Sequence, residues 1–140
     1  MSYSNIYTAK DFQMPEFDPI FDISNKTAIV TGASSGLGVT FAEFLAERGA
    51  NIVLSGRRVE RIEKTQLLLT ERNLSSIVVP CDVSDSSQVT TMFDIAEDKF
   101  GRVDIVVNNA GQIAEAGTVP EKITDEMFEQ TVKVNLLGLW

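Results

Sequence analysis

The chain has 140 residues, of which 44% are hydrophobic and 23% charged, an ordinary composition for one folded domain with its own core. Its net charge of −8 argues against a nucleic-acid partner, because phosphate backbones are bound by basic surfaces. One cysteine and no histidine exclude an internal disulfide, the commonest metal ligand and every histidine-based catalytic group.

No apolar run approaches the roughly 18 residues that a membrane span requires. Residues 1–10 are polar and lack the basic and then apolar pattern of a secretory signal. We therefore expect a protein of the reducing cytoplasm, with no membrane partner and no bound metal.

Residues 1–25 are predicted to be a lead-in segment. Acidic residues and two prolines surround its first aromatic residues, which follow no regular period: Tyr3, Tyr7, Phe12 and Phe17. Phe21 and Ile23 are expected to pack against the domain. The alternative is an interface arm, since aromatic side chains in a tail often bind a partner surface.

From residue 26 onward, short apolar runs alternate with segments of helical periodicity. The runs predict strands at 27–30, 51–54, 76–79 and 103–107. The periodic segments predict helices at 37–48, 59–71, 86–100 and from 125 onward. This alternation predicts an α/β protein with a Rossmann-type doubly wound parallel sheet, strand order 3-2-1-4. A ligand of such a sheet lies beyond the carboxyl ends of strands one and four, where the winding direction changes.

Apolar residues at helical spacing indicate which helix faces contact the sheet. In the first helix these are Phe41, Phe44 and Leu45. Gly49 is placed to cap its end. The third helix follows Asp85, a plausible N-cap with Gln88 three residues on. Its apolar stripe contains Val89, Met92, Phe93, Ala96 and Phe100.

The fourth predicted helix carries one polar residue in its apolar stripe, which contains Phe128, Val132, Asn135 and Leu139. A buried amide without partners costs roughly 1–3 kcal/mol. We therefore expect Asn135 to be bonded to backbone, water or a site network. By itself, a satisfied structural asparagine is the simpler interpretation.

A glycine-rich turn connects the first strand to the first helix, with glycines at Gly32, Gly36 and Gly38. This arrangement favours phosphate binding, because glycine lets backbone approach a diphosphate and a helix N-terminus presents free N–H groups to it. The spacing differs from both the nucleotide-hydrolysing P-loop and the common G-x-G-x-x-G pattern. A plain tight loop is the alternative.

Two arginines, Arg57 and Arg58, follow the second strand, about twenty residues after the glycine turn. An acid there would favour NAD by binding the ribose 2′-hydroxyl, and this chain offers none. Because guanidinium groups match phosphate oxygens, we predict NADP as the cofactor, with NAD as the alternative. The pair could also be solvated residues at the helix start.

Polar residues also follow the third and fourth strands. Asp82, before Val83, could accept a hydrogen bond from an adenine amino group or serve only as a turn residue. The neighbouring Cys81 is interpreted as a small hydrophobe. Asn108-Asn109-Ala110-Gly111 combines amides with small residues, which allows a ligand to approach closely, although a loop turn would use the same residues.

Together these stretches resemble the short-chain dehydrogenase/reductase family over residues 26–140. Thr31 to Gly38 is similar to the family's T-G-x-x-x-G-x-G cofactor turn, and residues 108–111 match its N-N-A-G motif. Asp82-Val83 resembles its adenine-contacting pair, and Val134-Asn135 resembles the site of its active-site asparagine. Four motifs in the right order, on the right predicted elements, are a specific resemblance.

The resemblance implies a role for each matching residue. The cofactor-binding residues would be Gly32, Ser34, Ser35, Gly36, Leu37, Gly38, Arg57, Asp82, Val83, Asn109, Ala110 and Gly111. The turn residues would line the diphosphate and its ribose, and Arg57 would meet the 2′-phosphate. Asn135 would be the catalytic residue of this chain, holding a water in a proton relay. Some NADP-using members carry a basic residue at the position of Ser35, which weakens the case for NADP slightly.

The catalytic tyrosine of the family, followed four residues later by a lysine, has no counterpart here. The only tyrosines are Tyr3 and Tyr7, which precede the glycine turn and lack a lysine at the fourth following place. We therefore interpret residues 26–140 as the N-terminal half of a dinucleotide-binding domain, truncated within helix four. Without a fifth strand, the apolar strand at 103–107 would be an exposed edge, so we expect the isolated chain to be marginally stable or to associate.

The leading functional hypothesis is an NADP-dependent oxidoreductase that transfers hydride between a nicotinamide and a small-molecule alcohol or ketone. The 140-residue chain alone is expected to be inactive, and the full-length protein to be a homo-oligomer. The alternative is a non-catalytic dinucleotide-binding or regulatory half-domain. A methyltransferase on a similar sheet fits the glycine spacing and residues 108–111 poorly.

Overall fold

The computed structural model describes residues 22–139. Most of the predicted lead-in lies outside the described residues, including the proposed interface arm and Phe21. Trp140 also lies outside them. Ile23 is partly buried and packs against the core, as the sequence predicted.

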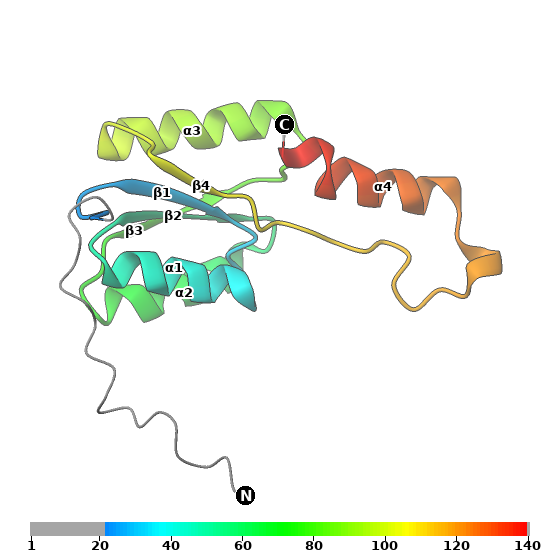
Figure 1. Ribbon diagram of the computed structural model, residues 1–140, viewed down its shortest axis with the longest axis horizontal. Coiled ribbons are helices and arrows are strands. Elements are labelled where there is room, and N and C mark those ends of the chain that lie inside the picture. Colours follow the sequence, from blue (N-terminus) through cyan, green and yellow to red (C-terminus); the bar gives the residue numbers. More distant parts are fainter. Residues whose placement is uncertain (1–21, 140) are drawn as a thin grey trace, which may run out of the picture.

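Four parallel strands form the sheet of the described chain, in the order β3-β2-β1-β4 (Figure 1). Their bounds are β1 Thr27–Thr31, β2 Asn51–Gly56, β3 Ser76–Pro80 and β4 Ile105–Val107. Val30 of β1 lies opposite both Leu54 of β2 and Val107 of β4, so the strands end side by side. The predicted fold class and strand order are confirmed.

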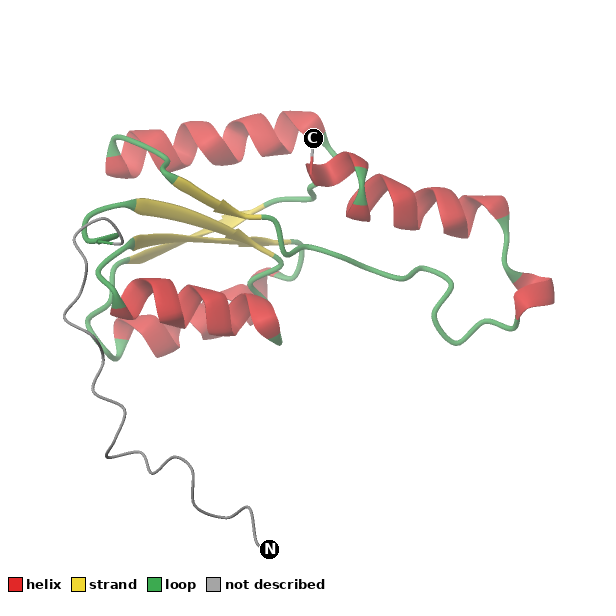
Figure 2. Cartoon of the chain, viewed as in Figure 1, coloured by secondary structure: helices red, strands yellow, loops and turns green. Residues whose placement is uncertain are grey.

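Helices cover both faces of this sheet (Figure 2). The α-helices are α1 Leu37–Glu47, α2 Val59–Thr70, α3 Ser86–Phe100 and α4 Asp125–Asn135. Two short 3-10 helices, η2 Pro120–Lys122 and η3 Leu137–Leu139, flank α4. Helices α1 and α2 lie on one face and α3 lies on the other, which gives the three layers of a doubly wound fold (Figure 1).

Each strand sends alternate side chains into two separate cores. Ala28 and Val30 of β1 join the core under α1 and α2, whereas Ile29 between them joins the core under α3. Leu54 and Val53 of β2 divide in the same way. This is why the strands read as continuous apolar runs in the sequence: both faces of a covered parallel sheet are buried.

The sheet-facing side of α1 matches the prediction only at Leu45, which packs against the core. Phe41 and Phe44 are 39% and 51% exposed, and the buried residues of the helix are Gly38, Ala42 and Ala46. Small residues on this face let the helix backbone approach the strands closely, so the bulky rings are left at the flank. The Phe44 ring instead lies under the guanidinium of Arg48, 3.4 Å from its centroid.

Helix α3 matches the prediction closely. The Asp85 carboxylate accepts hydrogen bonds from the backbone N–H groups of Ser87 and Gln88. Met92 and Ala96 are buried, and the other members of the predicted stripe pack around them. Gly101 ends the helix with φ 79°, a left-handed conformation that glycine adopts without strain.

The stripe predicted for the fourth helix, with Asn135 as its polar member, is not buried in the described chain. The helix stands away from the sheet at the end of the long segment 108–124 (Figure 1). Within the described chain its buried residue is Val134, while Phe128 is 60% exposed and Asn135 lies at the surface. The physical reason is that no described element packs over the predicted stripe.

Asp104 joins the start of β4 to β1. Its carboxylate accepts a hydrogen bond of 2.9 Å from the Thr27 N–H, and the Lys26 ammonium lies 3.6 Å away. The hydrogen bond from Thr27, with the charges of Arg102 and Lys26, lowers the pKa of Asp104. A carboxylate whose folded pKa is lowered stabilises the fold above its unfolded pKa, about 3.9, and loses that effect as the pH falls through the folded pKa.

We therefore predict that Asp104→Asn lowers the free energy of unfolding at pH 7 and flattens its decline below about pH 4. Denaturant unfolding between pH 7 and pH 3 measures both effects. The control is Asp98→Asn, which neutralises an exposed carboxylate on α3. Identical acid profiles for the two variants would show that the Asp104 contacts do not stabilise the sheet.

Candidate functional site

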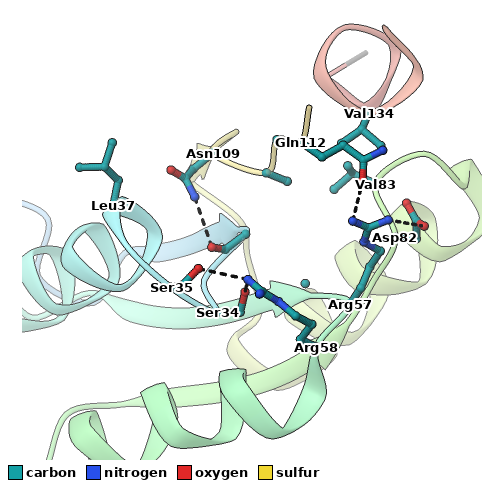
Figure 3. A pocket seen from close by; sticks show the side chains of 14 residues that line it. Ser34, Ser35, Leu37, Arg57, Arg58, Asp82, Val83, Asn109, Gln112 and Val134 are labelled. Carbon is teal, nitrogen blue, oxygen red and sulfur yellow. Dashed lines mark hydrogen bonds and ion pairs between the residues drawn. The ribbon is translucent and has the colours of Figure 1, made fainter. Parts of the chain in front are cut away.

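A cavity of about 530 Å³ lies at the carboxyl ends of the strands (Figure 3). Its walls come from the turn after β1, the first residues after β2, β3 and β4, and one residue of α4. The lining residues are Gly32, Ser34, Ser35, Leu37, Gly56, Arg57, Arg58, Asp82, Val83, Asn109, Ala110, Gly111, Gln112 and Val134. This is the place at which a doubly wound sheet binds its ligands, and the volume is typical of small-molecule sites.

The N-terminus of α1 opens beside this cavity without a cap. Gly36 precedes the helix, no side chain among residues 22–139 hydrogen-bonds to its first turn, and the first turn holds no acid. By contrast, Asp85 caps α3 and Thr124 caps α4. The free N–H groups and the positive dipole end of α1 therefore remain available to an anion.

Two of the three glycines in the turn are required by packing. A Cβ on Gly38 would lie 2.3 Å from the Gly32 carbonyl oxygen, and a Cβ on Gly32 would lie 2.9 Å from the Ala110 Cα. Gly36 has open space around it but adopts φ 59°, which favours glycine. Neither Gly36 nor Gly38 lines the cavity, so these two act through the shape of the turn.

Thr31 and Asn109 hold the ends of β1 and β4 together. The Thr31 hydroxyl donates to the Val107 carbonyl and accepts from the backbone N–H groups of Asn109 and Ala110, at 3.3, 3.1 and 3.0 Å. The Asn109 amide donates to the carbonyls of Thr31 and Gly32, at 3.0 and 3.3 Å. The Asn109 side chain thus fixes the floor of the cavity.

Thr65 of α2 fixes the other side of the glycine turn, and the sequence analysis missed it. Its buried hydroxyl donates to the Ala33 carbonyl at 3.0 Å, while the Ala33 N–H donates to the Ser55 carbonyl. Thr65 lies on the same helix face as Ile62 and Leu69, so a polar residue on an apolar face was the available signal.

Arg58 reaches the glycine turn and was not among the predicted cofactor-binding residues. One of its guanidinium nitrogens donates to the hydroxyls of Ser34 and Ser35, at 2.8 and 3.1 Å (Figure 3). The guanidinium and two hydroxyls together form a group of donors that suits a phosphate. The two adjacent arginines were visible in the sequence, but the sequence did not indicate which of them faces the turn.

Arg57 points across the cavity toward two other walls (Figure 3). It donates to the Gln112 side-chain oxygen at 2.7 Å and lies 3.8 Å from the Asp82 carboxylate. Hydrogen bonds from the Ser84 backbone and hydroxyl, with the charges of Arg57 and Lys133, lower the pKa of Asp82. Asp82 is therefore a carboxylate at neutral pH.

Asn135 joins the end of α4 to the segment after β4. Its amide oxygen accepts from the Gln112 N–H at 2.8 Å, and its amide nitrogen donates to the Gln112 carbonyl at 2.7 Å. The expectation that Asn135 is bonded to backbone is confirmed, although the residue is exposed. It borders the cavity through Gln112 and does not line it.

Comparison with known proteins identifies the family. The short chain dehydrogenase family model matches residues 26–140. The chain belongs to the short-chain dehydrogenase/reductase family. It is 37% identical over 119 residues to an uncharacterized oxidoreductase of Staphylococcus aureus strain USA300, and 39% identical over the same length to one of Staphylococcus epidermidis. These matches cover 83% of this chain and 48% of each relative, so the chain spans about half the length of the curated relatives it matches.

Solved structures agree with this assignment. A short-chain type dehydrogenase/reductase from Mycobacterium marinum superposes with a TM-score of 0.79 at 29% identity, over 85% of this chain and 47% of the other. A hydroxysteroid dehydrogenase from Escherichia coli gives a TM-score of 0.76 at 28% identity, over 83% and 48%.

The structure brings most of the predicted cofactor-binding residues of this short-chain dehydrogenase/reductase to one cavity. All of them line it except Gly36 and Gly38. The sequence analysis missed four lining residues, namely Gly56, Arg58, Gln112 and Val134. No sequence motif marks Gln112, which reaches the cavity through the path of the segment after β4. Val134 stands in a motif beside Asn135, but the motif did not indicate that its side chain lines the cavity.

Other chemistry has little support in the part of the chain that the structure describes. Residues 22–139 contain no cluster of three histidine, cysteine or acidic residues that could hold a metal ion. Cys81 is buried, and burial raises the pKa of its thiol, which agrees with the prediction of a small hydrophobe. No helix between residues 22 and 139 has the length and hydropathy to cross a membrane.

We predict that Gly38→Ala destabilises the chain by about 1–3 kcal/mol, because the new methyl group would meet the Gly32 carbonyl. The control Thr40→Ala changes an exposed residue of the same helix and should be neutral or slightly stabilising. Urea unfolding of both variants measures the difference. Equal stability of the two would mean that the turn yields to the added carbon.

Proposed function

We propose that this protein is an NAD(P)-dependent oxidoreductase that transfers hydride between a nicotinamide and a small-molecule alcohol or ketone. The observation that carries the proposal is the uncapped N-terminus of α1 beside a cavity of dinucleotide size. When bound, the nicotinamide supplies or accepts the hydride. The residues present fit such a group, because the α1 N-terminus can receive a diphosphate without displacing a protein cap.

The contacts of the cavity suggest which residues would hold the cofactor. The backbone of the turn from Ser34 to Gly38 would receive the diphosphate. Asp82, beside Val83, would face adenine, since its carboxylate is ionised and can accept a hydrogen bond. Asn109 would act by fixing the floor, because its amide is already bonded to Thr31 and Gly32.

NADP is the proposed cofactor and NAD the alternative. No acid follows β2, where NAD-binding sheets hold the ribose 2′-hydroxyl. Instead, Arg57 and Arg58 both line the cavity, and Arg58 donates hydrogen bonds to the hydroxyls of Ser34 and Ser35. These donors can surround a 2′-phosphate, whereas a plain ribose would offer no anion to Arg58.

Proton transfer to the substrate would involve Asn135 through a held water. The oxygen and the nitrogen of its side-chain amide are both hydrogen-bonded to the backbone of Gln112, and these bonds orient the amide at the end of the cavity. The 140 residues contain no tyrosine followed by lysine at the fourth place. The acid/base step therefore requires residues beyond this sequence, and the 140-residue chain alone should bind cofactor without turnover.

The second candidate is a non-catalytic dinucleotide-binding or regulatory half-domain. It is favoured by the absence, from the 140 residues, of a tyrosine with a lysine at the fourth following place. As part of either proposal, the protein would work in the reducing cytoplasm and assemble as a homo-oligomer when full length. Val106 of the edge strand β4 is exposed, and this supports the proposal that the edge associates with another protein surface.

We predict that the chain binds NADPH in a saturable manner and more tightly than NADH. Arg58→Ala should weaken NADPH binding roughly tenfold to hundredfold, the loss of a charge-assisted hydrogen bond, and change NADH binding little. Arg61→Ala, which removes an exposed guanidinium of α2 outside the cavity, is the control. Calorimetric titration measures the dissociation constants.

The outcomes separate the two candidates. Binding of NADPH without turnover of any ketone, even by a longer chain carrying the family's second half, would favour the half-domain. A wild-type chain that folds but binds neither nucleotide would contradict both candidates.

A further inference from the structure

The Gln112 side chain links two walls of the cavity that are far apart in the sequence. Its amide oxygen accepts a hydrogen bond of 2.7 Å from the Arg57 guanidinium, which comes from the segment after β2. In Figure 3 the Gln112 and Arg57 side chains meet over the cavity, with Asp82 on the far side of the guanidinium. Arg57 is thereby held over the cavity between Gln112, which follows β4, and Asp82, which follows β3.

The backbone of Gln112 is fixed independently of its side chain. Asn135 bonds both its N–H and its carbonyl, at 2.8 and 2.7 Å. These two bonds do not involve the Gln112 amide. A substitution of the Gln112 side chain therefore leaves the backbone anchored, and removes only what the amide does to Arg57.

The guanidinium of Arg57 needs such a partner because its side chain is half exposed. A free arginine samples many rotamers, and binding a phosphate with it requires that this freedom be lost. Gln112 is neutral and engages one nitrogen of the guanidinium, so it reduces that freedom while leaving the charge and other donors available. The nearby carboxylate of Asp82 is also bonded to Ser84.

We propose that Gln112 is a positioning residue that sets the preference for a nucleotide with a 2′-phosphate, by holding Arg57 over the cavity. This inference rests on the proposed function and deepens it. Gln112 acts through Arg57, so its effect is confined to ligands whose extra phosphate the guanidinium meets. NADH, which lacks that phosphate, is the internal reference.

The test compares the dissociation constants of NADPH and NADH for four forms of the chain: wild type, Gln112→Ala, Gln112→Glu and Gln130→Glu. Gln112→Ala should weaken NADPH binding roughly threefold to tenfold, as expected for one lost hydrogen bond, and leave NADH within about twofold. Gln112→Glu should weaken NADPH binding further, because its carboxylate would neutralise Arg57. Gln130→Glu adds the same charge on the exposed face of α4 and should change neither constant.

A mutant cycle distinguishes positioning from a general structural role. In an Arg57→Ala background, Gln112→Ala should have no further effect on NADPH binding, whereas a structural role would give the same loss in both backgrounds. A wild type that prefers NADPH, with an unchanged NADPH-to-NADH ratio in both Gln112 variants, would overturn this inference alone. A wild type that binds neither nucleotide would overturn it together with the proposed function.

Discussion

The hydroxyl of Thr31 is the contact on which the candidate site depends most. It joins β1 to β4 through the Val107 carbonyl and the N–H groups of Asn109 and Ala110. The chain after β1 enters α1 on one face of the sheet, whereas the chain after β4 leaves the sheet in the segment 108–124, so the space between the two strand ends is available to a ligand (Figure 1). Together with the Asn109 amide, this hydroxyl holds the residues that follow β4 against the glycine turn, where Gly32 lies close to Ala110.

The charge around the cavity is opposite in sign to the net charge of the chain. The chain carries a net charge of −8, yet Arg57 and Arg58 both line the cavity, with Asp82 as the acidic residue among its lining residues. The uncapped end of α1 adds a partial positive charge at the same place. An acidic surface with one positive concavity directs anions toward that concavity, since fields are focused where walls of low dielectric surround the charge.

The sequence was sufficient for the fold because the signals there are local and repeated. Continuous apolar strands such as Ala28 to Val30 and helices of 3.6-residue period determine the alternation, and handedness rules then leave one strand order. The site motifs could also be predicted, since glycine spacing and strand ends are sequence features.

The predictions failed where the outcome depended on the distance between elements. Phe44 was placed inward although α1 packs through alanine and glycine, and Asn135 was placed in a face that no described element covers. The roles of Arg58 and Gln112 depend on side-chain direction, which spacing does not encode.

The pairing of β4 with β1 has a consequence for how the molecule assembles. The β1-α1-β2 unit closes through neighbours in the sequence, whereas the Thr31 hydroxyl and the Val107 carbonyl are 76 residues apart. Closing so long a loop costs chain entropy before any contact compensates it, so this edge is expected to form late and to open early. The walls of the cavity on the β4 side therefore belong to the least cooperative part of the sheet. A ligand that contacts the residues after both β1 and β4 would stabilise the pairing of these strands. Ligand occupancy would then determine how long the chain stays folded.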